Sequence, residues 1–169
     1  MRIVLVEPEI PPNTGNIARL CAATDTELHL IEPLGFRLDA AALRRAGMDY
    51  WRQVRWQCWP SWRAYAEAVG AACHWFIEQG APRGYAEAHF AGGDALVFGR
   101  ETAGLPAALL EANRDRWLSI PMRNPAARSL NLANCAAIVL FEALRQQGFP
   151  GTARGPLPHG KMTLKEIVR

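Results

Sequence analysis

Three short segments contain five of the six asparagine residues of this sequence, together with glycine and isolated arginine residues. They are residues 13–19 (NTGNIAR), 98–106 (FGRETAGLP) and 120–134 (IPMRNPAARSLNLAN). In the last segment, Ser129, Asn131 and Asn134 stand where a long apolar helix begins. The first turn of a helix has unsatisfied backbone N–H groups, and one small polar side chain suffices to cap it. Three such side chains indicate either plain capping or a ligand bound at the helix start.

Several common catalytic patterns are missing from the sequence. No G-x-G-x-x-G follows the first apolar run and no Walker A lysine is present, so these nucleotide sites are not expected. The histidines offer no obvious base for Ser129, which leaves a small-molecule hydrolase built on this serine as an unfavoured alternative. The four cysteines have no CxxC pair and no histidine at zinc spacing. We therefore expect buried thiols in a reducing cytoplasm and no metal.

Alternating apolar runs and helical patterns must position the three segments. Strands are predicted at residues 2–6, 28–31, 54–58, 74–77, 95–98 and 118–120. Helices are predicted from a cap at Asn13 or Thr14, over 39–46, from a cap at Ser61, over 106–112 and over 129–147. This alternation predicts an α/β domain with a mainly parallel sheet. Loops at the carboxyl ends of parallel strands gather at one edge, where ligands bind, so the three segments should meet there.

Length and charge predict one domain with a tail. The 169 residues suit a single domain, placed here at residues 1–151. The net charge of +3 comes from a Pro/Gly-rich tail, residues 152–169, which either serves nucleic acid or is a solvated, disordered terminus. The sequence contains no run of about 18 apolar residues and no signal peptide pattern. We therefore expect a cytoplasmic protein without membrane contact.

Taken together and in order, the three segments resemble the three motifs of the SPOUT superfamily of RNA methyltransferases. NTGNIAR, VFGRETAGLP and IPM followed by RSLNLAN carry this resemblance. IVLVEPEIPPNTGNIARLCAAT, LHLIEPLGF and RRAGMDYW look like the subfamily that acts on the tRNA wobble ribose. The resemblance covers residues 2–151 and implies a C-terminal trefoil knot that binds S-adenosylmethionine (SAM). It also implies a homodimer that methylates the ribose 2′-hydroxyl of nucleotide 34 in tRNA.

The resemblance assigns roles to individual residues. Arg19 would be the catalytic residue, orienting the ribose and phosphate and stabilising developing negative charge, because a protonated guanidinium is a poor base. Asn16, Glu101 and Arg128 would support Arg19 or contact the tRNA. The cofactor cleft would be lined by Phe76, Gly99, Ile120, Ser129, Leu130 and Asn134. A side chain at Gly99 is expected to occupy cofactor space and leave the fold intact.

The sequence departs from the family pattern in two places. Glu78 and Gln79 stand where a Thr-Lys-like segment is usual, and Phe141 stands where relatives carry a tyrosine. The tryptophans at 51, 56, 59 and 62 are interpreted as core or dimer packing rather than as base-stacking platforms. The last helix and the first, over 17–23, are the expected dimer surface. A SAM-binding RNA-binding or assembly protein without turnover is the alternative function.

Overall fold

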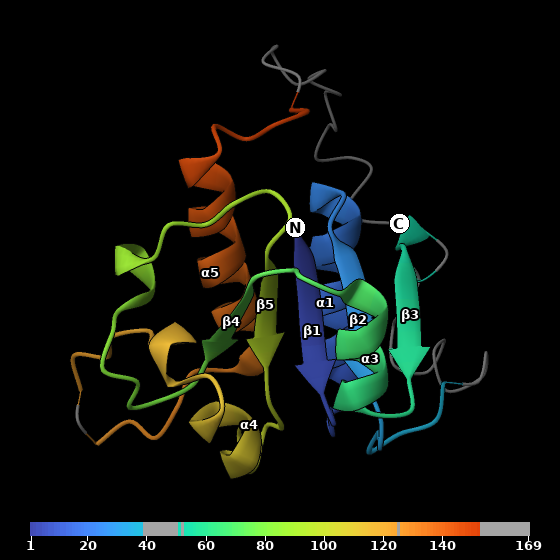
Figure 1. Ribbon diagram of the computed structural model, residues 1–169, viewed down its shortest axis with the longest axis horizontal. Coiled ribbons are helices and arrows are strands. Elements are labelled where there is room, and N and C mark those ends of the chain that lie inside the picture. The colour runs from blue at the N-terminus through green and yellow to red at the C-terminus, as the bar shows by residue number, and fades with distance from the viewer. Residues whose placement is uncertain (39–50, 52, 125, 153–169) are drawn as a thin grey trace, which may run out of the picture.

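The computed structural model describes residues 1–38, 51, 53–124 and 126–152, and its centre is a six-stranded sheet (Figure 1). The strands lie in the order β3-β2-β1-β5-β4-β6, and all pairs are parallel. Their bounds are β1 Arg2–Val6, β2 Glu27–Ile31, β3 Trp56–Trp59, β4 His74–Ile77, β5 Ala95–Phe98 and β6 Trp117–Leu118. The α-helices are α1 Pro11–Thr24, α3 Trp62–Val69, α4 Ala107–Glu111 and α5 Leu132–Gln146, and η2 Tyr85–Glu87 and η3 Arg114–Arg116 are short 3₁₀ turns. The predicted α/β fold with a parallel sheet is confirmed.

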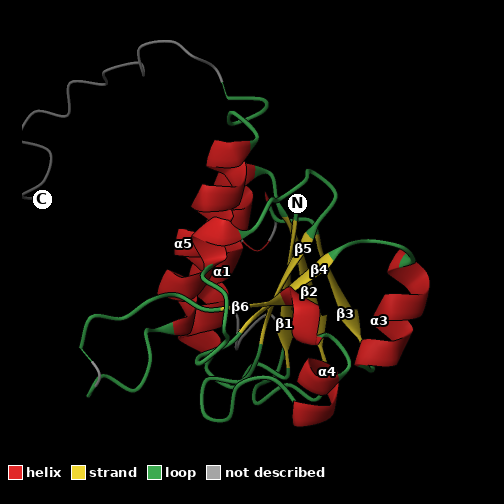
Figure 2. Ribbon diagram, turned by 60° about the vertical axis from the view of Figure 1, so that its left-hand side comes forward, coloured by secondary structure: helices red, strands yellow, loops and turns green. Residues whose placement is uncertain are grey.

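Helices cover both faces of the sheet, so the molecule has three layers (Figure 2). α1 and α5 contact each other on one face, while α3 and α4 lie over the other. Successive side chains of a strand point to opposite faces. In β1, Ile3 and Leu5 join the core under α1 and α5, and Val4 and Val6 join the core under α3 and α4. This double burial explains why the strands read as continuous apolar runs.

The order of the strands brings distant segments together. The chain runs outward from β1 through β2 to β3, then crosses to β4 and comes back to β5, which pairs with β1. Arg2 is thereby paired with Ala95, and Leu5 with Phe98. The change of direction between β1 and β5 is a topological switch point, the usual place for a ligand in such sheets. This strand order explains why the three polar segments meet at one edge of the sheet, as predicted.

Several predicted boundaries were displaced or wrong. α1 begins at Pro11, and Ile10 is its N-cap without a side-chain hydrogen bond, so the predicted caps Asn13 and Thr14 lie inside the helix. Proline is tolerated in a first turn, where its missing N–H has no partner to lose. β6 ends at Leu118 because Ser119 turns away to bridge to Gly84. β3 is displaced by a residue or two from its predicted place at 54–58.

Other predictions held. The side chains of Ser61 and Asn131 cap α3 and α5. Trp51 is buried and Trp59 and Trp62 pack against the core around Tyr65, as expected of packing residues, whereas Trp56 is 38% exposed. The predicted helix at 39–46 and the tail at 153–169 lie outside the described residues.

The connection from β6 to α5 carries the third polar segment. Residues 119–124 leave the β6 edge of the sheet, and residues 126–131 lead into α5, which packs beside α1 and contacts β5 (Figure 2). This path places the start of α5 next to the loops that follow β1 and β5. The trefoil knot implied for this part of the chain stays a prediction.

Candidate functional site

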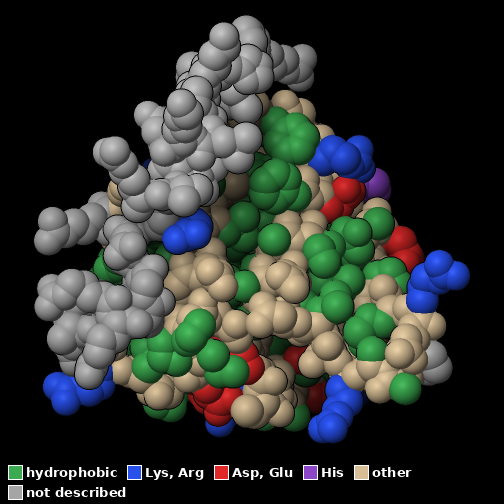
Figure 3. Space-filling view, turned by 180° about the vertical axis from the view of Figure 1, so that it is seen from behind, with side chains coloured by type: hydrophobic (Ala, Val, Ile, Leu, Met, Phe, Trp, Pro, Cys, Tyr) green, Lys and Arg blue, Asp and Glu red, His purple; other side chains and the backbone are tan. Residues whose placement is uncertain are grey.

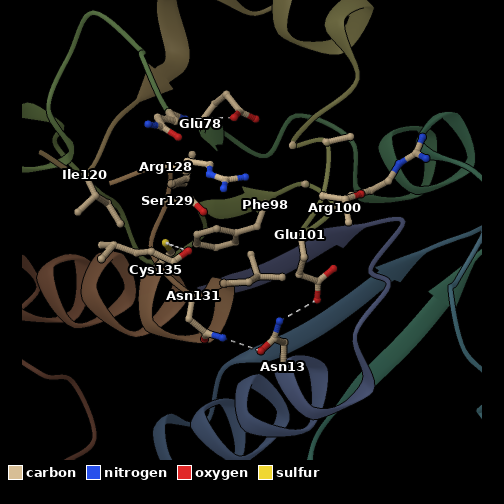
Figure 4. A pocket seen from close by; sticks show the side chains of 18 of the residues that line it. Asn13, Glu78, Phe98, Arg100, Glu101, Ile120, Arg128, Ser129, Asn131 and Cys135 are labelled. Atoms are coloured by element: carbon tan, nitrogen blue, oxygen red, sulfur yellow. Dashed lines mark hydrogen bonds between the residues drawn. The ribbon is translucent and has the colours of Figure 1, made fainter. Parts of the chain in front are cut away.

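A cavity of about 750 Å³ lies at the carboxyl ends of β4, β5 and β6 (Figure 4). This volume is in the range of small-molecule and cofactor sites, which are mostly apolar with a few placed polar groups. All three polar segments contribute to its lining. Apolar side chains come from Ile77, Phe98, Ile120, Leu130 and Leu132, and polar or charged ones from Asn13, Glu78, Arg100, Glu101, Arg128, Ser129 and Asn131.

One wall of the cavity is a tight loop, residues 99–105. The backbones of Arg100 and Gly104 exchange two hydrogen bonds of 3.0 and 2.9 Å, which closes the loop on itself. A Cβ atom added to Gly99 would lie 2.1 Å from the carbonyl carbon of Gly104, far inside the contact distance of two atoms. Glycine at 99 is therefore required by the fold. The expectation that a side chain there leaves the fold intact was wrong, because the backbone occupies the space assigned to the cofactor.

The carboxylate of Glu101 joins this wall to α1. It accepts hydrogen bonds from the backbone N–H groups of Glu9 and Ile10, at 2.9 and 3.2 Å. It also accepts one from the side-chain amide of Asn13 at 3.1 Å. Ile10 caps α1 without a side-chain hydrogen bond, and the carboxylate from a distant loop instead holds the two residues just before the first turn. Glu101 thus fixes the start of the helix that carries Asn16 and Arg19.

The start of α5 is connected to the Glu101 carboxylate through Asn13. The Asn131 side-chain oxygen accepts hydrogen bonds from the N–H groups of Ala133 and Asn134, which caps the helix. Its amide nitrogen donates to the Asn13 oxygen at 2.9 Å. A continuous chain of hydrogen bonds therefore runs from Asn131 through Asn13 to Glu101 (Figure 4). Ser129 and Leu130, just before the cap, face the cavity without forming part of this chain.

Comparison of the sequence with known protein families identifies the family of this chain. A model of the SpoU rRNA Methylase family matches residues 1–141, which is most of the chain. This chain belongs to the SpoU rRNA Methylase family. The resemblance to SPOUT RNA methyltransferases is thereby confirmed.

Relatives of this SpoU-family chain include proteins of nearly the same length. A tRNA (cytidine(34)-2'-O)-methyltransferase of Burkholderia cenocepacia (strain HI2424) is 52% identical over 155 residues, covering 89% of this chain and 98% of the relative. A solved structure concerned with 2-OH methylation of C/U34 on tRNA is 43% identical, with a TM-score of 0.81 over 87% of this chain and 95% of that one. The SpoU methyltransferase AviRb from Streptomyces viridochromogenes, in complex with AdoMet, is 26% identical, with a TM-score of 0.73 over 87% and 60% of the two chains.

The SpoU-family structure places most of the predicted site residues at the cavity. Its lining includes Gly99, Glu101, Ile120, Arg128, Ser129 and Leu130. Phe76 does not line it, and this expectation needs correction. Its side chain is fully buried under α3 and α4, and the next residue, Ile77, faces the cavity instead. Asn134 also lies outside the lining, as an exposed residue of the first turn of α5. Asn16 and Arg19 are exposed on α1 and do not line the cavity.

Several lining residues were not predicted as site residues, among them Asn13, Glu78, Arg100 and Cys135. Asn13 was interpreted as a cap, and Glu78 was noted only as a departure from the family pattern. No sequence pattern pointed to Cys135 as a site residue, and it is half-buried at the cavity. Burial raises the pKa of its thiol, which keeps it protonated and a poor nucleophile.

The chemistry of the lining favours binding over nucleophilic catalysis. The described residues that line the cavity include no histidine, so Ser129 has no histidine base in this set. This observation counts against the hydrolase alternative. In the described part of the chain, no three His, Cys, Asp or Glu side chains group as metal ligands would. Helices long and apolar enough to span a membrane are likewise not found among the described residues.

Proposed function

We propose that this protein transfers a methyl group from SAM to the ribose 2′-hydroxyl of nucleotide 34 in tRNA. The observation that carries the proposal is the cavity that all three polar segments form at the carboxyl ends of β4, β5 and β6. The relatives support the substrate, because a protein with 52% identity is named for this reaction on cytidine 34. The AdoMet complex of a similar SpoU methyltransferase supports the donor.

The cavity suits a ligand with an apolar ring system and a polar tail. Ile120 and Leu130 offer apolar surface, and Ser129 and the backbone around Gly99 offer hydrogen-bonding groups. When bound, SAM supplies an activated methyl group on its sulfonium. The residues of the chain orient the donor and exclude water, which is the main requirement of a displacement that needs no covalent intermediate.

Arg19 is proposed to act on the tRNA. It lies on the exposed side of α1, outside the cavity, so it is placed to meet the polynucleotide and not the donor. A guanidinium can hold the ribose–phosphate with two parallel hydrogen bonds and stabilise the charge that develops on the 2′-oxygen. Asn16 is exposed one turn earlier on α1, and Arg128 lines the cavity, so both are proposed to support this contact. The general base is left unassigned.

We also propose that the protein works as a homodimer in the cytoplasm, where tRNA is found. Phe141 of α5 is 48% exposed and Phe149 is 36% exposed, and their rings lie 6.3 Å apart. Hydrophobic side chains are spread over the face that α1 and α5 form (Figure 3). Ile17 and Cys21 are buried inside the chain, so only the exposed edge of α1 is left for a partner. Sedimentation at micromolar concentration should give a dimer, and a monomer would contradict this proposal.

Methyl transfer to total tRNA tests the proposed activity. Protein, radiolabelled SAM and bulk tRNA should give labelled tRNA, with the label in a 2′-O-methylated nucleoside at position 34. A tRNA carrying a 2′-deoxynucleotide at position 34 is the matched control, because it lacks the accepting hydroxyl. SAM binding without label in any tRNA would favour the alternative, a SAM-binding RNA-binding or assembly protein without turnover. Hydrolysis of a small molecule by the protein in the absence of SAM would point to the hydrolase alternative.

A further inference from the structure

Glu78 lines the cavity but has no part in the roles described above. It directly follows β4, and its half-buried side chain lies between that strand and the wall at 99–105 (Figure 4). One carboxylate oxygen accepts a hydrogen bond from the backbone N–H of Leu105 at 2.8 Å. The other accepts one from the N–H of Gln79 at 3.1 Å. The carboxylate therefore ties the end of β4 to the far end of the wall.

The wall leaves room for this carboxylate through a glycine. A Cβ atom at Gly104 would lie 2.6 Å from one Glu78 oxygen and 2.8 Å from the other. Gly104 also has a φ of +69°, a conformation that other residues rarely adopt. The carbonyl group of Gly104 lies against Gly99, which directly follows β5. Gly104 is therefore close to both Gly99 and the Glu78 carboxylate, so we expect a shift of the carboxylate to move the wall.

The hydrogen bond to Leu105 has no ready substitute. Leu105 is 5% exposed, so water has little access to its backbone N–H. A buried N–H without a partner is costly, and the wall would have to move outward to bring this group into contact with water. Glu101 holds the other part of the same wall through Glu9, Ile10 and Asn13. Two carboxylates from different elements therefore fix the wall from two sides.

We infer that Glu78 is a positioning residue for the methyl donor, acting by holding residues 99–105 in the shape that binds SAM. The inference rests on the proposed function, because that function supplies the ligand. Glu78 is assigned no contact with the tRNA and no proton transfer. Its removal should therefore affect the donor and not the accepting nucleotide.

The test compares Glu78→Leu and Glu78→Gln with the wild type, and uses Glu67→Leu as the matched control. Glu67 lies on α3, on the other side of the sheet, with its side chain 65% exposed. Glu78→Leu removes the acceptor for Leu105, so the Kd of SAM by calorimetry and its KM should rise about 10-fold or more. The kcat at saturating SAM and the KM for tRNA should stay near the wild-type values. Glu78→Gln keeps an oxygen that can accept from Leu105, so it should stay within about threefold.

The outcomes separate this inference from the proposed function. A wild-type protein that binds no SAM refutes both. A wild-type protein that binds SAM, with Glu78→Leu within about twofold of it, overturns the inference alone. A Glu78→Gln variant as weak as Glu78→Leu also overturns it, because the hydrogen bond would then not be the cause. If Glu78→Leu does not fold, Glu78→Ser gives the same comparison, since its side chain stays polar but is too short to reach Leu105.

A double-mutant cycle with Gly104→Ala tests the contact between the two residues. A methyl group at 104 collides with the Glu78 carboxylate, in addition to the backbone strain that it causes in any background. Gly104→Ala should therefore weaken SAM binding less in Glu78→Ser than in the wild type, because the short serine side chain removes one of its two causes. Equal effects in both backgrounds would show that Glu78 and Gly104 act independently, which contradicts the inferred contact.

Discussion

Replacement of Glu101 by alanine should destabilise the protein and lower methyl transfer. The substitution leaves the N–H groups of Glu9 and Ile10 and the side-chain amide of Asn13 without their acceptor. A buried N–H that loses its acceptor costs about 1–3 kcal/mol, and loss of an anion at a helix start costs about 0.3–1 kcal/mol. The unpaired amide adds about 1 kcal/mol. Because Glu101 is only half-buried, water offsets part of this cost, and we expect a total of about 2–3 kcal/mol.

Thermal unfolding followed by circular dichroism measures this loss. For a chain of this size, each kcal/mol lowers the Tm by about 2–4 °C, so Glu101→Ala should lower it by about 4–12 °C. Glu101→Gln keeps one acceptor oxygen and should recover part of the loss. The control is Glu111→Ala on α4, where the carboxylate is 55% exposed and paired only with Arg114 among the described contacts. This variant should stay within about 0.5 kcal/mol of the wild type.

The rate of methyl transfer, measured well below the Tm, is a second test of Glu101→Ala. Glu101 positions the start of α1, the helix that carries Asn16 and Arg19, so methyl transfer by folded Glu101→Ala should be slower than that of the control. A Tm within about 2 °C of the Glu111→Ala value would refute the conclusion that Glu101 holds the start of α1 in place.

Three further predictions test other parts of the structure. Arg19→Ala should keep the Tm and the SAM affinity of the wild type but lower the rate of methyl transfer by about 100- to 1,000-fold. Arg63→Ala on α3 is the exposed control. Near-normal methyl transfer by Arg19→Ala would show that Arg19 is not the catalytic residue. Gly99→Ala should lower stability by about 1–3 kcal/mol or more in urea unfolding, because its methyl group meets the backbone of Gly104, and an unchanged midpoint would contradict that packing. Burial lowers the pKa of His29 and His74 from 6.5, so the unfolded chain binds protons first as the pH falls. The contribution of these two histidines to stability should therefore be constant above about pH 7 and be lost as the pH drops through 6.5, and a flat profile from pH 7 down to pH 5 would be evidence against neutral buried histidines.

Local patterns in the sequence were enough to predict most of the sheet. Arg2–Val6 and Ala95–Phe98 are short, continuous apolar runs because both faces of these strands are buried, and they were predicted at their observed bounds. Ser61 and Asn131 precede apolar helical patterns and do cap their helices. In each case the residues that form the pattern lie within a few positions of one another, so the strand or the helix start can be predicted from a short stretch of sequence.

Contacts between residues far apart in the sequence could not be predicted from the same patterns. A strand buried on both faces has no polar side, so nothing in HWFI tells which of Phe76 and Ile77 faces the cavity. The role of Glu101 depends on a contact with Glu9, 92 residues earlier, which exists only because β1 and β5 are neighbours. The first helix begins at Pro11 and not at the predicted cap Asn13 or Thr14, and a carboxylate from elsewhere in the chain supports the chain just before that start.

The hydrogen-bond chain from Asn131 to Glu101 has a direction. The Asn131 oxygen faces N–H donors, so its nitrogen must face Asn13. The Asn13 oxygen then accepts, and its nitrogen donates to the carboxylate. Each amide is thereby held in one orientation, and a carboxylate cannot replace either amide. Deamidation, the slow hydrolysis that turns asparagine into an acid, would at Asn13 set two carboxylates against each other, so the chemical ageing of a single side chain would open the link between the two helices and the cavity wall.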